Sequence, residues 1–339
     1  MRTTEQSFVE VMSGHAGKRV FFEPLRGNNG DRLIRMGAER VFERAGVTLV
    51  DEPGAAELIV INGGGAMNDV WGGGIGRLEH YRGGFPTTPI VVGPSTFEFE
   101  TDRFAKICAS TETPITLFGR DRTSYAAVTE LGLDDRVTLG LSQDLAFELK
   151  GGSWVEEQRA KRSEGHVVVC MRKDKEGGAK LLAQTKAPWL PAPIRKPLSR
   201  LRDRLVASGR KGLVDRLIDE AGVDPRLPRV VRDISVSVDF EAFCEAIRGA
   251  AFIMADRMHV SILGYLLDKP TVLLAGAYHK NASVHAFSMA HEGSCVRFVD
   301  PKAGEPGVTD SAGAAARAGG AGAGESGGSE GEGTLRAAG

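Results

Sequence analysis

The 339-residue sequence predicts an α/β fold with parallel sheets in two domains. Short apolar strands alternate with helical segments, which is typical of parallel sheets covered by helices on both faces. The alternation occurs twice, before residue 150 and again after a polar stretch at residues 151–165. Glycine-rich or charged loops follow the strands at the end where such sheets bind ligands. The sequence therefore predicts a ligand site built from strand-end loops.

The domain boundaries follow from changes in composition. We expect an N-terminal domain at residues 1–150, a C-terminal domain at 151–300 and a disordered tail at 301–339. The tail is nearly all Ala, Gly, Ser and Glu, so it cannot bury enough apolar surface to offset the entropy of ordering. A basic, proline-containing segment at about 173–229 carries no strong strand signal.

Composition excludes several classes of protein. The net charge of −1 gives no sequence-wide basic field for nucleic acid or anionic lipid. The four cysteines lie far apart and form no zinc-type cluster, so we expect buried thiols, no metal and no cofactor. The sequence shows neither a secretory leader nor an apolar run long enough to span a membrane. These observations favour a cytoplasmic protein.

Strands and helices alternate clearly in the first half. The strand Arg19–Leu25 precedes a helix at Arg32–Ala45, for which Asp31 is the expected N-cap and Gly46 the end. The further elements expected here are strands at Leu58–Ile61, Pro89–Gly93 and Pro114–Phe118, and a helix at Ser124–Leu131.

The second half repeats the pattern. The expected strands are His166–Met171, Asp233–Val238, Ala251–Met254 and Thr271–Leu274, and the expected helices are Asp239–Arg248 and Val260–Leu267.

Two glycine-rich loops are candidate ligand surfaces. In Gly27–Asp31, the residues Asn28 and Gly30 allow close backbone approach at a helix start, where an anion or polar ligand is favoured. A tight turn with a capping Asp31 explains the same residues. The second loop contains Gly64 and Gly65, which suit either a ligand surface or close packing of helix on sheet.

Four charged or titratable side chains also follow strands. Arg120 suits bidentate binding of a carboxylate or phosphate, and the alternative is a surface ion pair with Asp121 or Asp144. Arg257 and His259 stand two residues apart at a helix start and form a compact cationic site. Asp256, just before them, is a candidate to cap that helix or to orient His259.

Lys280 follows the strand Thr271–Leu274 and could reach the same site as a further phosphate contact. The alternative is a solvated lysine in a loop.

Six segments in this order resemble the polysaccharide pyruvyl transferase family over roughly residues 18–290. The matching segments are Gly27–Asp31, Gly63–Gly65, Arg120–Ser124, Asp144–Phe147, Arg257–His259 and Pro270–Lys280. The basic segment at 173–229 and the sequence after Lys280 depart from the family pattern.

The resemblance implies two Rossmann-like domains of the glycosyltransferase B type (GT-B-like), with a ligand cleft between them. It implies transfer of a pyruvyl group from phosphoenolpyruvate to hydroxyls of a saccharide acceptor, free or lipid-linked, as in exopolysaccharide biosynthesis. Arg120 and Arg257 would hold phosphoenolpyruvate, and His259 would take part in proton transfer. We expect Lys280 to assist the arginines and Asp31 to contact a sugar hydroxyl.

Other functions remain open from the residues alone. A nucleotide-sugar glycosyltransferase would also use glycine-rich loops and cations on a diphosphate. A non-catalytic member of a polysaccharide assembly complex is a second alternative, but it would need neither Arg257 nor His259. The missing G-x-G-x-x-G pattern argues against a nicotinamide dehydrogenase.

Overall fold

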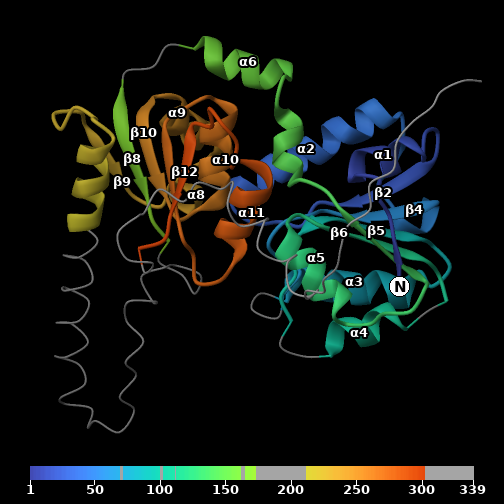
Figure 1. The fold of residues 1–339 in the computed structure, drawn as a ribbon. Coiled ribbons are helices and arrows are strands. Elements are labelled where there is room, and N and C mark those ends of the chain that lie inside the picture. Colours follow the sequence, from blue (N-terminus) through green and yellow to red (C-terminus); the bar gives the residue numbers. More distant parts are fainter. Residues whose placement is uncertain (69–71, 100–101, 111, 162–164, 173–210, 302–339) are drawn as a thin grey trace, which may run out of the picture. The chain divides into compact units, whose positions relative to one another are not determined.

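The computed structural model describes residues 1–68, 72–99, 102–110, 112–161, 165–172 and 211–301. Residues Met1–Pro301 form one compact unit that contains two parallel sheets (Figure 1). The α/β class with two parallel sheets is therefore confirmed. The expected disordered tail lies outside the described residues from 302 onward, and so does most of the basic segment, at 173–210.

Seven parallel strands from the first half of the chain form the first sheet. They are β1 (Arg2–Thr3), β2 (Arg19–Glu23), β3 (Thr48–Val50), β4 (Leu58–Ile61), β5 (Ile90–Ser95), β6 (Ile115–Gly119) and β7 (Val137–Leu141). Their spatial order is β1-β7-β6-β5-β4-β2-β3. Strand β1 pairs with β7, so the beginning of the chain closes the edge of a sheet otherwise completed by residue 141.

Helices cover both faces of this sheet because its strands are buried on both sides. In β4, Leu58 and Val60 point into one core and Ile59 and Ile61 into another. The first core also contains side chains of α1 (Phe8–Ser13) and α2 (Asn29–Ala45). The second contains side chains of α3 (Gly73–Gly84), α4 (Arg103–Cys108) and α5 (Arg122–Thr129).

The second sheet has five parallel strands in the order β12-β11-β10-β8-β9. They are β8 (His166–Cys170), β9 (Arg229–Val231), β10 (Ala250–Ala255), β11 (Thr271–Leu274) and β12 (Val296–Val299). One face shares a core with α9 (Phe240–Arg248), α10 (Met258–Leu266) and α11 (Lys280–Ser288). The other face packs against the helical residues 211–220.

Apolar side chains from the first half of the chain join the core of the second sheet. Leu33 of α2, Phe147 of the 3-10 helix η2 (Leu145–Leu149) and Val155 of α6 (Ser153–Ala160) belong to the same cluster as Phe243 and Leu263. The division into domains at 1–150 and 151–300 stays a prediction, although each sheet draws its strands from one side of it.

Both sheets share a doubly wound strand order. Setting β1 aside, the strands of each sheet lie in the order second, first, third, fourth and fifth along the chain, and the first sheet continues with a sixth. The direction of winding reverses between β2 and β4 in the first sheet and between β8 and β10 in the second. Ligands of open α/β sheets bind beyond the carboxyl ends of the strands at such a reversal.

Several predicted elements need correction. Asn28, rather than Asp31, caps α2, and Asp31 is the third residue of a capping box whose carboxylate accepts from the Asn28 amide. The expected strand Asp233–Val238 is instead the short helix α8 (Ile234–Ser237). The polar link at 151–165 contains α6, whose Val155 is fully buried.

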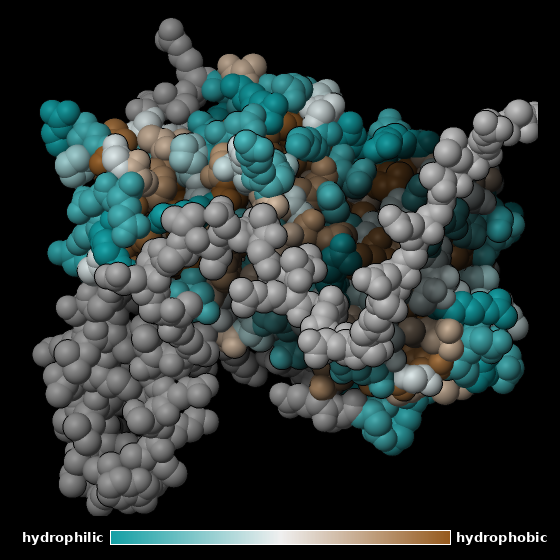
Figure 2. All heavy atoms as spheres, in the orientation of Figure 1, coloured by the Kyte–Doolittle hydropathy of each residue, from teal (hydrophilic) through white to brown (hydrophobic). Residues whose placement is uncertain are grey.

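The surface formed by the described residues is mainly hydrophilic. Figure 2 shows hydrophilic residues over most of the coloured part of this face, with apolar residues largely in the hollows between them. Within the described ranges the exposed large apolar side chains are Leu49, Val231 and Val236, and no helix is long and apolar enough to cross a membrane. Of the four free cysteines, Cys108, Cys170 and Cys244 are buried as expected, whereas Cys295 is half-buried.

Candidate active site

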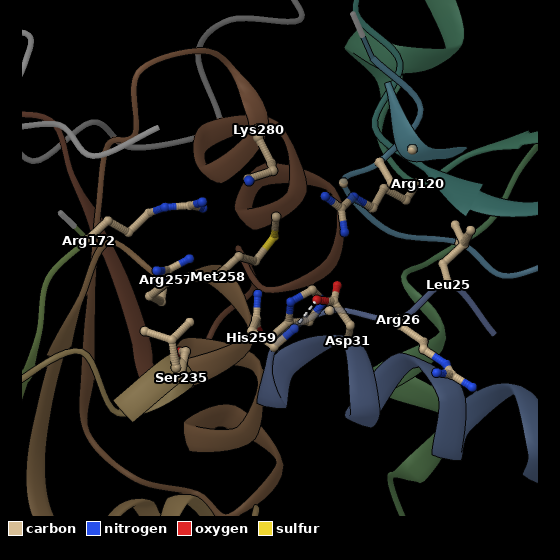
Figure 3. A pocket seen from close by; sticks show the side chains of 17 residues that line it. Leu25, Arg26, Asp31, Arg120, Arg172, Ser235, Arg257, Met258, His259 and Lys280 are labelled. Carbon is tan, nitrogen blue, oxygen red and sulfur yellow. Dashed lines mark hydrogen bonds between the residues drawn. The ribbon is translucent and has the colours of Figure 1, made fainter. Parts of the chain in front are cut away.

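A pocket of about 420 Å³ lies beyond the carboxyl ends of strands from both sheets (Figure 3). Among the described residues that line it, five carry positive charge and one, Asp31, carries a carboxylate. The lining residues are Leu25, Arg26, Gly27, Asn28, Asp31, Gly63, Gly65, Ala66, Gly73, Arg120, Arg172, Ser235, Val236, Arg257, Met258, His259 and Lys280. This charge balance suits a multiply charged anion.

Arg120 is fixed by a buried network at the end of β6. Its Nη1 donates to Asp144 Oδ2 at 2.6 Å and its Nε to Thr96 Oγ1 at 2.8 Å. Arg120 is 1% exposed and Asp144 is fully buried, so this is a buried pair and not the surface pair considered above. Charge-assisted bonds of this kind hold the guanidinium in one orientation.

His259 joins the same network from the second sheet. It is the second residue of α10, and its Nε2 lies 3.3 Å from Asp144 Oδ2. Burial alone would raise the pKa of Asp144. The adjacent His259 and Arg120, with the hydrogen bond from the Ala146 amide, instead hold that pKa well below its ordinary value. Asp144 is therefore a carboxylate that orients His259 and Arg120 together.

Arg257 pairs with a carboxylate of its own. Its Nε lies 3.1 and 3.2 Å from the two Asp233 oxygens, and its Nη2 donates to Asp233 Oδ2 at 2.5 Å. Both residues are nearly buried, and Asp233 follows β9, the edge strand beside β8. Arg257 itself is the N-cap of α10, so one helix start supplies both Arg257 and His259 to the pocket.

The start of α2 packs directly against His259. A Cβ on Gly30 would lie 2.6 Å from His259 Cβ, so only glycine fits there. The predicted site residues Asn28 and Asp31 line the pocket through their capping box, whereas Gly30 lies under the histidine and is not part of the lining. One oxygen of Asp31 is engaged by the Asn28 amide at 2.7 Å.

Lys280 begins α11 and lines the pocket at 8% exposure. A Cβ on Gly65 would lie 3.8 Å from Lys280 Nζ and 3.6 Å from Arg120 Nη2. The two cations therefore flank the same point above Gly65. Gly64, also predicted as a contact, turns away from the pocket, because its Cβ would meet Ile34 of α2 at 2.9 Å.

Asp256 does neither of the things expected of it. It does not cap α10, and its Oδ1 accepts from the Arg172 amide at 2.7 Å. Arg172, Asp233 and Ser235 were not predicted as site residues. Asp233 and Ser235 lie in the segment that was expected to be the strand Asp233–Val238, and not in a loop after a strand. Arg172 follows the strand that ends at Cys170, which was the available signal.

The arrangement can bind an anion and hold a proton donor beside it. No group of metal-ligating side chains occurs within the described ranges. The assignments of individual roles to these residues remain predictions.

Comparisons with known proteins agree with the architecture. The model of the polysaccharide pyruvyl transferase family matches residues 28–278. Among solved structures, the chain is similar to the crystal structure of a functionally uncharacterised protein from Klebsiella pneumoniae subsp. pneumoniae NTUH-K2044. That match has 17% identity and a TM-score of 0.58, and it covers 85% of this chain and 95% of the other. At this identity the likeness concerns the fold alone. No curated protein matches the chain.

Proposed function

We propose, from the fact that this chain belongs to the polysaccharide pyruvyl transferase family, that it transfers a pyruvyl group from phosphoenolpyruvate to a saccharide. Membership makes the chain a transferase enzyme. The identity of the donor, the formation of a ketal and a place in exopolysaccharide biosynthesis in the cytoplasm are parts of the proposal. The acceptor is a saccharide with two hydroxyls that one ketal can bridge, free or lipid-linked.

The observation that supports the donor is the convergence of cations around His259. Phosphoenolpyruvate carries about three negative charges near neutral pH, two of them nearly complete on the phosphate. The pocket offers Arg120, Arg172, Arg257 and Lys280 at exposures of 8% or less. Cations in a water-poor site act more strongly on such a ligand than they do in bulk water.

The chemistry requires a proton at C3, the loss of two hydroxyl protons and one group transfer. One hydroxyl proton balances the proton added to C3, and the other leaves on the released phosphate. A proton adds to C3 of the enol, and positive charge develops at C2. One sugar hydroxyl bonds to C2 and loses its proton. The C2–O bond to phosphate then breaks, and a second hydroxyl bonds to C2 and loses its proton to complete the ketal. Inorganic phosphate is the leaving group.

His259 is the residue we assign to proton transfer. It lies at the pocket wall, and Asp144 binds its Nε2 side. Asp144 is a positioning residue, since it stands behind both His259 and Arg120. Asp31 contacts an acceptor hydroxyl through the carboxylate oxygen that the Asn28 amide does not occupy.

The direct test is phosphate release from phosphoenolpyruvate with a library of saccharide acceptors, followed by mass spectrometry of the products. We expect an acceptor-dependent release and the mass of an added pyruvyl group. Release of a nucleoside diphosphate from a nucleotide sugar, with no phosphate release from phosphoenolpyruvate, would favour the glycosyltransferase alternative instead.

His259→Ala is expected to lower kcat by about a hundredfold or more, the scale of positioned acid–base catalysis. The exposed His80, on α3, provides the matched control, and His80→Ala should leave turnover unchanged. Near-normal turnover of a folded His259→Ala protein would remove His259 from the mechanism.

A further inference from the structure

We propose that Arg172 holds the phosphate of the donor on the second-sheet side of the pocket, while Arg120 takes the carboxylate on the other side. This assignment rests on the proposed function and adds the orientation of the donor in the pocket. It names the end of the donor that each sheet binds, and it adds a residue that sequence patterns did not indicate.

The position of Arg172 follows from the strand order of the second sheet. Strands β8, β10 and β11 are neighbours, and their carboxyl ends lead to Arg172, Arg257 and Lys280 respectively. Neighbouring strands lie about 5 Å apart, so side chains from their ends can meet on one small ligand. In Figure 3 the nitrogen ends of these three side chains point toward the same space above Met258.

Hydrogen bonds tie the three strand ends into one rigid unit. The Arg172 amide donates to Asp256 Oδ1 at 2.7 Å, which links the end of β8 to the end of β10. Asn281, adjacent to Lys280, donates its Nδ2 to the carbonyls of Asp256 and Leu274 at 2.9 and 2.8 Å. Asp256 and Asn281 are buried, so this framework is built into the fold and does not depend on a flexible surface.

The donor groups on the two sides differ in number. Arg120 uses Nε and Nη1 on Thr96 and Asp144, and its Nη2 is the nitrogen that faces Gly65. One such edge suits a carboxylate. Arg257 likewise has Nε and Nη2 on Asp233, so each of these two arginines has one engaged edge. The second sheet adds Arg172 and Lys280, and three cationic groups suit the three terminal oxygens and nearly two charges of a phosphate.

This orientation places the reacting carbons near the proton-transfer group. With the carboxylate toward Arg120 and the phosphate toward Arg172, C2 and C3 lie between the two sides, where His259 stands against Asp144. The phosphate released in the transfer step then remains on the second-sheet side. Inorganic phosphate is therefore the probe that reports on Arg172.

Calorimetry with inorganic phosphate tests the assignment directly. We expect Arg172→Gln to weaken phosphate binding about tenfold or more, the scale of one lost charge-assisted hydrogen bond, and to raise the KM for phosphoenolpyruvate similarly. Arg172→Lys should recover part of both. Inhibition by pyruvate, which has the carboxylate and no phosphate, should change by much less.

Controls separate the possible failures. Arg226, an exposed arginine paired with Asp224, provides the matched variant Arg226→Gln, which should bind phosphate like the wild type. Equal losses for phosphate and pyruvate, or unchanged phosphate binding in Arg172→Gln, would overturn the inference. If Arg172→Gln does not fold, Arg172→Met takes its place, and unchanged phosphate binding together with an unchanged KM in that variant overturns the inference. If the wild type binds phosphate but transfers no pyruvyl group, the proposed function fails, and calorimetry still decides the role of Arg172.

Discussion

Three consecutive glycines after β4 meet three different surroundings. A Cβ on Gly63 would lie 2.2 Å from the Pro94 carbonyl oxygen, and Gly64 has a φ of 125°, which side-chain-bearing residues rarely adopt. Only Gly65 has ordinary space around a Cβ, and that space faces Arg120 and Lys280. The backbone packing therefore requires the first two glycines, although Gly63 also lines the pocket, and Gly65 is the one whose Cβ would enter the space between the two cations.

Alanine substitutions should separate these roles. Gly65→Ala should keep the thermal midpoint within a few degrees of the wild type but raise the KM for phosphoenolpyruvate, because the methyl group sits between the two cations. Gly63→Ala should lower the thermal midpoint strongly, since backbone must move to admit the Cβ. Thermal unfolding and steady-state kinetics on both variants check this, and equal thermal midpoints for the two would contradict it.

Asp144 links stability to pH. Its pKa is lowered in the folded state, so its contribution is fully present above the ordinary aspartate value of about 4 and is lost as the pH falls through the folded-state value. Asp144→Asn leaves Arg120 buried without its counter-charge. We expect the variant to lose about 3–5 kcal/mol of unfolding free energy at pH 7.

The difference between wild type and Asp144→Asn should therefore shrink as the pH is lowered below about 4. Denaturant titrations at a series of pH values measure it. The exposed pair of Asp224 and Arg226 supplies the control Asp224→Asn, which should show little difference at any pH. A difference in unfolding free energy that stays constant down to pH 2 would contradict the lowered pKa of Asp144 in the folded state.

At the scale of elements, the first turn of α2 contacts several parts of the site. Asn28 and Asp31 line the pocket, Gly30 supports His259, and Asn29 reaches the segment that follows β9. The Asn29 side-chain amide donates to the carbonyl of Val238 at 3.0 Å and lies 3.3 Å from that of Ile234. That segment also carries Asp233, the partner of Arg257.

Asn29→Ala should raise the KM for phosphoenolpyruvate and change the thermal midpoint only slightly, because it loosens the segment that fixes Arg257. Asn29→Asp should raise this KM further, since its carboxylate would face carbonyl oxygens. Steady-state kinetics on both variants test the point, with Arg35→Ala on the exposed face of the same helix as a control. A normal KM in Asn29→Ala would show that the contact is incidental.

The sequence predicts those elements whose own residues carry a strong pattern. The strands Leu58–Ile61 and Thr271–Leu274 have the expected bounds because each contains a run of at least three apolar residues and is buried on both faces. Strand β1 has two residues and β3 is largely exposed, so neither carries an apolar run. Asp233–Val238 alternates like a strand, but it forms the helix α8 instead.

The predicted site residues that follow clearly patterned strands lie close together in the structure, and their roles stay predictions. Arg120, Arg257, His259 and Lys280 follow strands with clear apolar runs, and the structure brings all four to one pocket. The pairing of Arg257 with Asp233 could not be predicted, because it depends on β9 lying next to β8. Contacts across a sheet are set by strand order, which local patterns do not contain.

At the scale of the whole molecule, the site uses the winding reversal of both sheets. The loops after β2 and β4 reach the pocket from the first sheet, and those after β8 and β10 reach it from the second. The apolar cluster that contains Leu33 and Phe147 together with Leu263 joins the two sheets behind it. The pocket therefore depends on both sheets being folded and in contact.

The reactivity of the cysteine thiols tests whether the core of the molecule is packed as described. Burial raises the pKa of the Cys108, Cys170 and Cys244 thiols to about 12, so they carry almost no thiolate at pH 8. We expect slow reaction of these three thiols with a disulfide reagent in the native protein, and rapid reaction of all four in denaturant. The half-buried Cys295 should react first. Fast native reaction of Cys170 would contradict the described core.

The pairing of β1 with β7 has a consequence for how the molecule is made. Arg2 and Thr3 register against Thr138 and Leu139, so these two residues are synthesised long before their pairing partners. At about 5–20 residues per second, that delay is roughly 7 to 28 s. A nascent chain that stops before residue 137 has no partner strand for Arg2 and Thr3, so the first sheet acquires its edge strand β1 only after residue 141 has been translated.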